Sequence, residues 1–339
     1  MIKIDIYAHI LPKKYFDELQ KRAPGRFYMD KRFKNIPCLF DLETRFRIMD
    51  EFEGYVQVLT LSSPPLEVVL GPKDAAELAQ IANDEMAELV GKYPDRFFAA
   101  VAALPMNNIE AAEKELERAI EDLNMKGVQV YTNVNGKPLD DPQFHFLFER
   151  MAQYDLPIWL HPARSERFSD YKTEDRSKYD VWFCFGWPYE TAAAMTRIIF
   201  AGIFDQYPNL KIITHHLGGM VPYFADRIRG TYDQFGTRTD EDRKILDQLK
   251  RHPCDYFKLF YADTALHGAW LPAIRCGLAF FGSDRVLFGS DMPFDVEGGS
   301  KYIRDAILAV EQVASSPAER KKLFELNAKR ILKYGRDEV

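Results

Sequence analysis

The chain has 339 residues, of which 47% are hydrophobic and 14% aromatic, and its formal net charge is −6. Single α/β barrels reach this length, although two domains would also fit, and the apolar content is ample for a large core. The negative charge argues against a surface for nucleic acids or anionic membranes. The four cysteines form no C-x-x-C pair, and the chain contains neither a run of 18 apolar residues nor a recognisable signal peptide. We therefore expect a cytoplasmic protein without a disulfide framework or zinc ribbon.

The first predicted strand lies within residues 1–12, where isoleucine alternates with polar residues at the period of a strand with one buried face. Tyr7 and His9 are two residues apart, so both side chains point to the same side of an extended chain. The next stretch, up to Asp41, contains a Pro-Gly pair and several aromatic residues without a clear period. We predict an irregular flap over residues 13–41, inserted after the first strand near the mouth of a site.

Strands and helices then alternate along the rest of the chain. The predicted strands begin near residues 2, 55, 97, 127, 157, 211, 256 and 286, and helices are predicted over 42–53, 75–93, 108–123, 141–154, 190–204, from 219, over 300–313 and over 317–334. Residues 164–188, after the fifth strand, have no period and are predicted to form a functional lid. Eight alternating units favour a (β/α)8 TIM barrel, in the α/β class, as a single domain over residues 1–339. No Gly-x-Gly-x-x-Gly follows the first strand, which weakens a dinucleotide-binding sheet.

Polar residues that can bind a metal fall at the ends of five of the eight predicted strands. Each is an unremarkable residue alone, because histidines near strands are mostly structural and aspartates there mostly form caps or turns. In a barrel, however, these strand ends meet on the face that carries the active site. Histidine and carboxylate ligands together suit Zn²⁺, Mn²⁺ or Fe²⁺. The residues are His9, His161, His215 or His216, Asp263 and Asp291.

Five motifs resemble the amidohydrolase superfamily, in the branch that contains aminocarboxymuconate-semialdehyde decarboxylase and the resorcylate-type decarboxylases. They span nearly the whole chain in the expected order and are specific for the branch, though not for one substrate. They read I-D-I-Y-A-H-I-L-P at 4–12, E-T-R-F-R-I-M-D at 43–50, L-P-I-W-L-H-P at 156–162, H-H-L-G-G at 215–219 and L-F-G-S-D-M-P at 287–293.

The resemblance implies a set of metal ligands and a proton carrier. His9, His161 and Asp291 would hold one divalent cation, with zinc favoured over manganese and iron. His216, which leads H-x-G-G, would activate water or move a proton without holding the metal, and Asp291 is the other candidate for the proton transfer.

The resemblance also implies two arginines with roles toward ligands. Arg45 matches the arginine that grips a substrate carboxylate, and a guanidinium fork suits that task. From the residues alone, a surface arginine on a helix would be the preferred interpretation. Arg227 falls in a region that lies near the partner subunit's site in relatives, which implies a homodimer.

Tyr7 departs from the family pattern, which has histidine at this position or, in some decarboxylases, glutamate. A phenol titrates near pH 10, so binding as a phenolate would demand a large lowering of its pKa by the metal. Three interpretations remain open. Tyr7 is a weak or absent ligand, or it donates a hydrogen bond to substrate, or the metal is lost and the barrel has another use.

The function that the resemblance implies is metal-dependent, non-oxidative decarboxylation of an aromatic or unsaturated carboxylic acid. Trp187 and its aromatic neighbours in the lid would form flat walls for such a substrate, although ordinary packing of a loop explains them equally well. The small carboxylate is the expected partner, with no nucleic acid and no membrane. Two alternatives remain: a hydrolase or hydratase acting on a ring-cleavage-type or cyclic substrate, and a catalytically silent barrel that binds a small acid or a protein.

Overall fold

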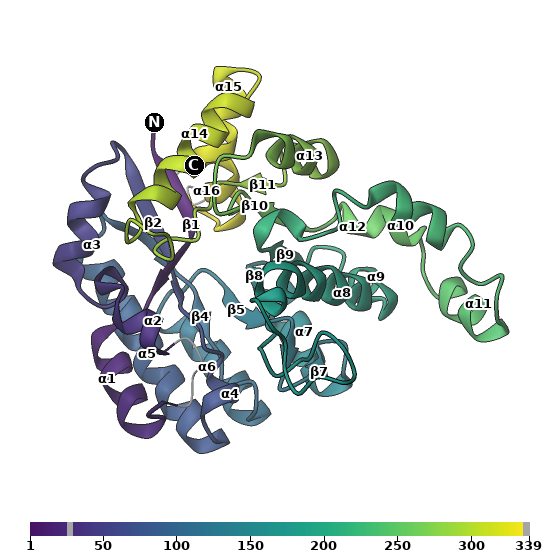
Figure 1. Cartoon of the computed structure of the whole chain (residues 1–339), viewed down its shortest axis with the longest axis horizontal. Helices are drawn as coiled ribbons and strands as arrows, with labels where there is room; N and C mark the ends of the chain where they lie inside the picture. Colours follow the sequence, from purple (N-terminus) through teal and green to yellow (C-terminus); the bar gives the residue numbers. More distant parts are fainter. Residues whose placement is uncertain (26–29, 335–339) are drawn as a thin grey trace.

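The computed structural model describes residues 1–25 and 30–334 (Figure 1). Its central feature is a ring of parallel strands: β1 (Lys3–Ile10), β2 (Tyr55–Leu61), β3 (Phe97–Ala100), β4 (Ala102–Ala103), β5 (Val128–Tyr131), β8 (Pro157–His161), β9 (Lys211–Thr214), β10 (Tyr261–Asp263) and β11 (Val286–Leu287). Only Val101 separates β3 from β4, and its N–H donates to the Leu59 carbonyl at 2.9 Å. β3 and β4 therefore act as one strand, which gives eight positions around the ring.

Hydrogen bonds between the first and last strands close the ring. The strand order is β1-β2-β3 in one sheet and β11-β10-β9-β8-β5-β4 in the other. The segment that begins with β11 joins β1 through Ile6 N–H to Phe288 O (3.0 Å) and Asp291 N–H to Tyr7 O (3.1 Å). A parallel bridge also pairs Ala8 with Met292. The predicted (β/α)8 barrel is thus confirmed, and its strand ends converge on one face.

Two apolar clusters hold the barrel together. The smaller one fills its interior with side chains such as Ile4, Val58, Trp159 and Ile213. The larger one lies between the strands and the surrounding helices. Those helices are α3 (Leu42–Met49), α4 (Leu66–Val69), α5 (Pro72–Lys92), α6 (Ile109–Glu121), α7 (His145–Tyr154), α8 (Trp187–Phe200), α9 (Ile203–Gln206), α13 (Leu271–Phe281), α14 (Ser300–Val313), α15 (Pro317–Lys321) and α16 (Asn327–Ile331). This alternation of strand and helix follows the predicted order, except that no helix was predicted where α13 lies.

Two predicted segments differ from the structure. The flap is not irregular, since it contains α1 (Lys13–Arg22), α2 (Asp30–Lys34) and a short 3-10 helix, while residues 26–29 lie outside the described part. Tyr15 and Leu19, four residues apart, are the buried face of α1. The strand predicted from residue 256 is also wrong, because α12 (Pro253–Phe257) comes first and β10 begins only at Tyr261. His252 caps α12 by accepting from Cys254 N–H, and Pro253 is its first residue.

The lid and a projecting arm complete the fold. Residues 162–180 form neither helix nor strand, and the π-helix η3 (Trp182–Gly186) leads into α8. Helices α10 (Ala225–Tyr232) and α11 (Asp240–Asp247) extend away from the barrel (Figure 1). Every residue of α10 and α11 is at least partly exposed. None of the described helices has the length and apolar character needed to cross a membrane.

A chain of buried polar side chains lies behind β1. Arg45 Nε donates to Gln57 Oε1 at 2.7 Å, and Gln57 Nε2 donates to Tyr55 Oη at 3.1 Å. Tyr55 Oη donates to Asp5 Oδ2 at 2.5 Å, and the same oxygen accepts from Ser290 Oγ. All five residues are buried. The network therefore connects α3, β2, β1 and the loop that follows β11.

This network fixes the backbone of β1. Asp5 Oδ1 accepts from the N–H groups of Tyr7 and Ser290, each at 3.0 Å. Burial raises the pKa of Asp5 to about 6, although these hydrogen bonds oppose the shift. Arg45 Nη1 donates to the carbonyls of His9 (2.8 Å) and Cys38 (3.2 Å). Arg45 and Asp5 thus hold the two ends of the strand that carries Tyr7 and His9.

Replacing Arg45 with alanine should lower the free energy of unfolding by about 2–5 kcal/mol, because two buried carbonyls and the Gln57 amide lose their donors. The midpoint of urea unfolding, followed by circular dichroism, measures the change. Arg47→Ala is the matched control, since Arg47 lies on the same helix but is exposed, and it should leave the midpoint almost unchanged. Equal midpoints for both variants, with a raised KM for Arg45→Ala alone, would return Arg45 to the role of substrate clamp.

Candidate active site

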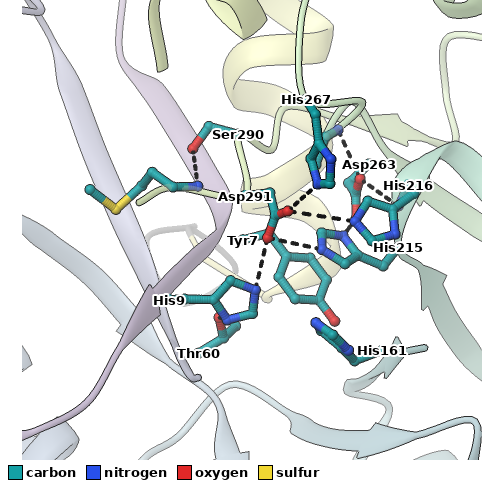
Figure 2. A network of polar contacts seen from close by, with 12 residues as sticks. Tyr7, His9, Thr60, His161, His215, His216, Asp263, His267, Ser290 and Asp291 are labelled. Carbon is teal, nitrogen blue, oxygen red and sulfur yellow. Dashed lines mark hydrogen bonds and ion pairs between the residues drawn. The ribbon is translucent and has the colours of Figure 1, made fainter. Parts of the chain in front are cut away.

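Histidine and aspartate side chains meet at the carboxyl ends of the barrel strands (Figure 2). His9 comes from β1 and His161 is the last residue of β8, while His215 directly follows β9. Asp263 ends β10, and Asp291 lies in the loop after β11. All five side chains are buried. The structure therefore brings together side chains from the strand ends that the sequence analysis singled out.

In His9, His161 and His215 a neighbouring oxygen contacts Nδ1, so that Nε2 of each ring is available as a ligand. Their ligand atoms lie within 4.8 Å of one another. In each ring Nδ1 is next to a protein oxygen: Thr60 Oγ1 at 3.2 Å from His9, Pro162 O at 2.7 Å from His161, and Asp263 Oδ2 at 2.6 Å from His215. Oxygen partners of this kind orient the imidazoles of metal sites and fix their tautomer.

Asp291 is the carboxylate around which the histidines gather. Its Oδ1 lies 3.0 Å from His9 Nε2 and 3.3 Å from His215 Nε2. Its Oδ2 lies 2.6 Å from His267 Nε2 and 3.5 Å from His216 Nε2. Burial alone would raise the pKa of Asp291, but the surrounding histidines, His215 first among them, hold it well below its usual value. Asp291 is therefore an anion in the middle of the site.

The protonation states of three of the histidines suit metal binding. Burial lowers the pKa of His9, lowers that of His161 well below its usual value, and lowers that of His216 to about 4. These three imidazoles are thus neutral near pH 7, the form that binds metals. Burial would lower the pKa of His215 too, but Asp263 and Asp291 outweigh it and raise the pKa to about 9.

The donor set fits one divalent cation. His9 Nε2 and His216 Nε2 are buried and make no well-aligned hydrogen bond within the described residues, although each faces Asp291. Unpaired buried nitrogens are costly unless something binds them. Imidazole nitrogens and a carboxylate oxygen are the ligands that zinc, manganese and iron accept in proteins.

Tyr7 is a buried neutral phenol in this site. Its ring stacks on the His215 ring, with centroids 3.7 Å apart and planes at 18°. Its Oη has no hydrogen-bond partner among the described residues and points toward His161 in Figure 2. Burial, reinforced by Asp263, raises the pKa of Tyr7 well above 10. This environment disfavours a phenolate ligand and favours the interpretation of Tyr7 as a weak or absent ligand.

A pocket opens beside His161 and Asp291. The Trp187 ring lies in it, 5.3 Å from the His161 ring and nearly parallel to that of His216. The flap contributes Arg32 and Phe33, so flap, lid and cluster share one space. The pocket is lined by Arg32, Phe33, Ser63, His161, Phe183, Trp187, His267, Asp291, Phe294 and Tyr302.

Two of the residues predicted to bind substrate lie outside the lining of this pocket. Arg45 is fully buried behind β1, where Nε and Nη1 donate to Gln57, His9 and Cys38 and Nη2 has no partner among the described residues. Arg227 lies on the exposed helix α10. Neither residue lines the pocket in the part of the chain that the structure describes. A single chain therefore does not bring these two arginines to the site.

Sequence reasoning missed His267 and Arg32. His267 lies four residues after the end of β10, and its ring stacks on Tyr302 with centroids 5.0 Å apart and planes at 4°. Its position past a strand end was a usable signal, because the loops after barrel strands form the active-site face. Arg32 lies in the run D-K-R-F-K, which resembles a solvated helix face and gives no such signal.

Comparisons with known proteins agree with this architecture. The chain is 33% identical, over an alignment of 347 positions, to gamma-resorcylate decarboxylase from Polaromonas sp. strain JS666, covering 98% of this chain and 99% of that protein. It is 30% identical over 309 positions to 2-amino-3-carboxymuconate-6-semialdehyde decarboxylase from Dictyostelium discoideum, covering 86% and 82%. Both relatives are therefore matched along most of their length.

A solved structure shows the same fold. The crystal structure of dihydroxybenzoic acid decarboxylase from Polaromonas sp. JS666, with bound manganese and the inhibitor 2-nitroresorcinol, has a TM-score of 0.81 at 30% identity, and the match covers 99% of this chain and 98% of that one. The family model described as amidohydrolase matches residues 4–334. The chain belongs to the amidohydrolase family.

Proposed function

We propose that the protein is a metal-dependent, non-oxidative decarboxylase that removes CO2 from an aromatic or unsaturated carboxylic acid. The observation that carries the proposal is a cluster beside a pocket with aromatic walls, in which His9 and His161 form one group with His215 and Asp291 lies 3.0 Å from His9. The names of the relatives support it, since gamma-resorcylate decarboxylase and 2-amino-3-carboxymuconate-6-semialdehyde decarboxylase are both carboxy-lyases by name.

The proposed ligands are His9, His161 and Asp291, with zinc as the favoured cation and manganese and iron as alternatives. A divalent cation at this position supplies Lewis-acid stabilisation of negative charge on substrate oxygens. The manganese in the Polaromonas structure supports a divalent ion in this type of site. Burial of the cluster excludes water, which strengthens electrostatic interactions within it.

Arg32 is the proposed anchor for an acidic group of the substrate. Its guanidinium is exposed at the pocket, and one terminal nitrogen, Nη2, donates to the Phe294 carbonyl at 2.6 Å. Among the described residues no other hydrogen-bond partner takes the remaining donors of the fork, and a guanidinium pairs with a carboxylate in bidentate fashion. Phe183 and Trp187 then offer flat apolar surfaces for the conjugated part of the molecule.

The reaction breaks the bond between the carboxylate carbon and the conjugated carbon, and the electron pair stays on the conjugated system while CO2 leaves. One proton must then reach that carbon, and His216 or Asp291 is the proposed carrier. His267 contacts Asp291 Oδ2 at 2.6 Å and its side chain is 31% exposed, so it links the buried carboxylate to solvent. This link provides a route for the proton that each turnover consumes.

The proposal extends to the assembly and location of the protein. We propose a homodimer in which Arg227 lies near the partner's site, because α10 and α11 project from the barrel with every residue at least partly exposed. A cytoplasmic location is proposed from the sequence features given above.

Removal of the metal should abolish CO2 release, and stoichiometric Zn²⁺ or Mn²⁺ should restore it.

Asp291→Asn should lower kcat by roughly 10³-fold or more while the circular dichroism spectrum stays unchanged, because the variant loses the charge of a ligand. A screen of hydroxybenzoates and unsaturated diacids, with CO2 as the measured product, provides the assay. Undiminished turnover by metal-free protein contradicts the proposal, and turnover of cyclic substrates without CO2 would favour the hydrolase alternative.

Arg32→Ala should raise KM for the carboxylate substrate by roughly 10–1,000-fold with a smaller effect on kcat, about the loss of a bidentate pair. Steady-state kinetics on the best substrate from the screen measure the change. Lys31→Ala is the matched control, since Lys31 is the exposed neighbour of Arg32 and is not among the pocket residues. If both variants have the wild-type KM, Arg32 does not anchor the substrate.

A further inference from the structure

We infer that His215 is itself a metal ligand, so that three histidines and one aspartate hold the cation. The inference rests on the proposed metal-dependent function and adds a ligand that the sequence motifs do not assign. It also explains how a site with a buried phenol at Tyr7 keeps a full set of donors.

The geometry places His215 at the junction of the cluster. Two groups of side chains in the described structure could hold a metal ion: His9 with His161 and His215, and His215 with His216 and Asp291. His215 belongs to both groups. Its Nε2 lies 3.3 Å from Asp291 Oδ1, the oxygen that His9 Nε2 approaches at 3.0 Å. A cation bound by His9, His161 and Asp291 is therefore next to His215 as well.

Asp263 orients His215 as a ligand. Asp263 Oδ1 accepts from the backbone N–H groups of His216 (3.2 Å) and Ala265 (2.9 Å), which fixes the carboxylate. Oδ2 is thereby directed at His215 Nδ1, at 2.6 Å. When Nδ1 donates its proton to Asp263, Nε2 keeps a free lone pair, and this lone pair faces the centre of the cluster. A carboxylate behind a histidine is the usual support of a metal-binding imidazole.

The plane of the His215 ring is fixed from both sides. Tyr7 stacks at a centroid distance of 3.7 Å, and His216 stacks at 3.8 Å with planes at 29°. The three rings are buried, so the imidazole is held in one orientation. Tyr7 therefore contributes packing instead of a ligand atom, and the histidine that it supports provides the nitrogen.

A competing arrangement uses the same contacts without a cation at His215. There, His215 is an imidazolium that forms ion pairs with Asp263 and Asp291. The two arrangements differ in what His215 Nε2 carries, which is a metal ion in one and a proton in the other. Metal binding measured directly, without reference to turnover, distinguishes them.

The test compares metal binding by the wild-type protein with that of His215→Asn, His9→Asn and His216→Asn. An asparagine amide can still donate to Asp263 in place of Nδ1, but it has no atom at the position of Nε2. We expect one Zn²⁺ or Mn²⁺ per chain for the wild type and His216→Asn, measured by elemental analysis after dialysis. For His215→Asn and His9→Asn we expect Kd to rise by about 100-fold or more in chelator competition, and the absorption spectrum of the Co²⁺ form to change.

Each outcome assigns the site differently. An unchanged Kd and Co²⁺ spectrum in His215→Asn, with loss of binding in His9→Asn, overturns the inference and leaves the proposed function standing. Loss of binding in His216→Asn but not in His215→Asn also overturns it. A wild-type protein that binds no divalent metal removes the proposed function and this inference together.

A second measurement needs no variant and covers the case in which His215→Asn does not fold. With ¹¹³Cd²⁺ bound to wild-type protein labelled with ¹⁵N-histidine, three ring nitrogens should show coupling to the metal. Coupling to only two would contradict a site with three histidine ligands and overturn the inference.

Discussion

The site depends on the seam where the first and last strands of the barrel meet. His9 and Asp291 come from opposite ends of the sequence, and their side chains lie 3.0 Å apart because the Asp291 N–H donates to the Tyr7 carbonyl across this seam. The buried carboxylate of Asp5 accepts from one N–H on each side of it, at Tyr7 and at Ser290. A shift of one residue in this pairing would turn the side chains of β1 to the other face and dismantle the cluster.

The charges at this seam are unbalanced in a way that a cation would correct. Asp291 is an anion surrounded by imidazoles, of which burial keeps His9 and His216 neutral. Buried neutral nitrogens gain little from a carboxylate unless a proton or a metal ion lies between them. The cluster therefore has more nitrogen and oxygen lone pairs than the protein's own N–H and O–H groups can satisfy. Because Asp291 is an anion, it carries no proton to donate by itself. Its contact with the partly exposed His267 is therefore important for the supply of a proton.

The sequence predicted the parts of this site that follow from strand position, and missed those that follow from packing. His9, His161 and Asp291 could be found because barrel strand ends converge, and the order of strands and helices was predicted with the exception of β10, α13 and the flap. Arg45 could not be placed, because the pattern of α3 does not show that this arginine faces the core while Arg47 faces solvent. The sequence could not show whether the ring of His215 or that of His216 contacts Asp263, because this contact depends on the position of Asp263 in the fold. The single domain, zinc and the dimer stay predictions.

The exposed position of Arg32 at the pocket mouth matches the demands of the proposed decarboxylation. A carboxylate that leaves as CO2 loses its charge, so a buried arginine pairing tightly with it would stabilise the ground state more than the transition state. Arg32 is exposed, and water weakens its attraction to an anion. It can therefore select and orient an acid without holding the reacting group too firmly. Stabilisation of the charge that moves into the conjugated system then depends on the buried cluster, where the low dielectric makes electrostatic interactions strong.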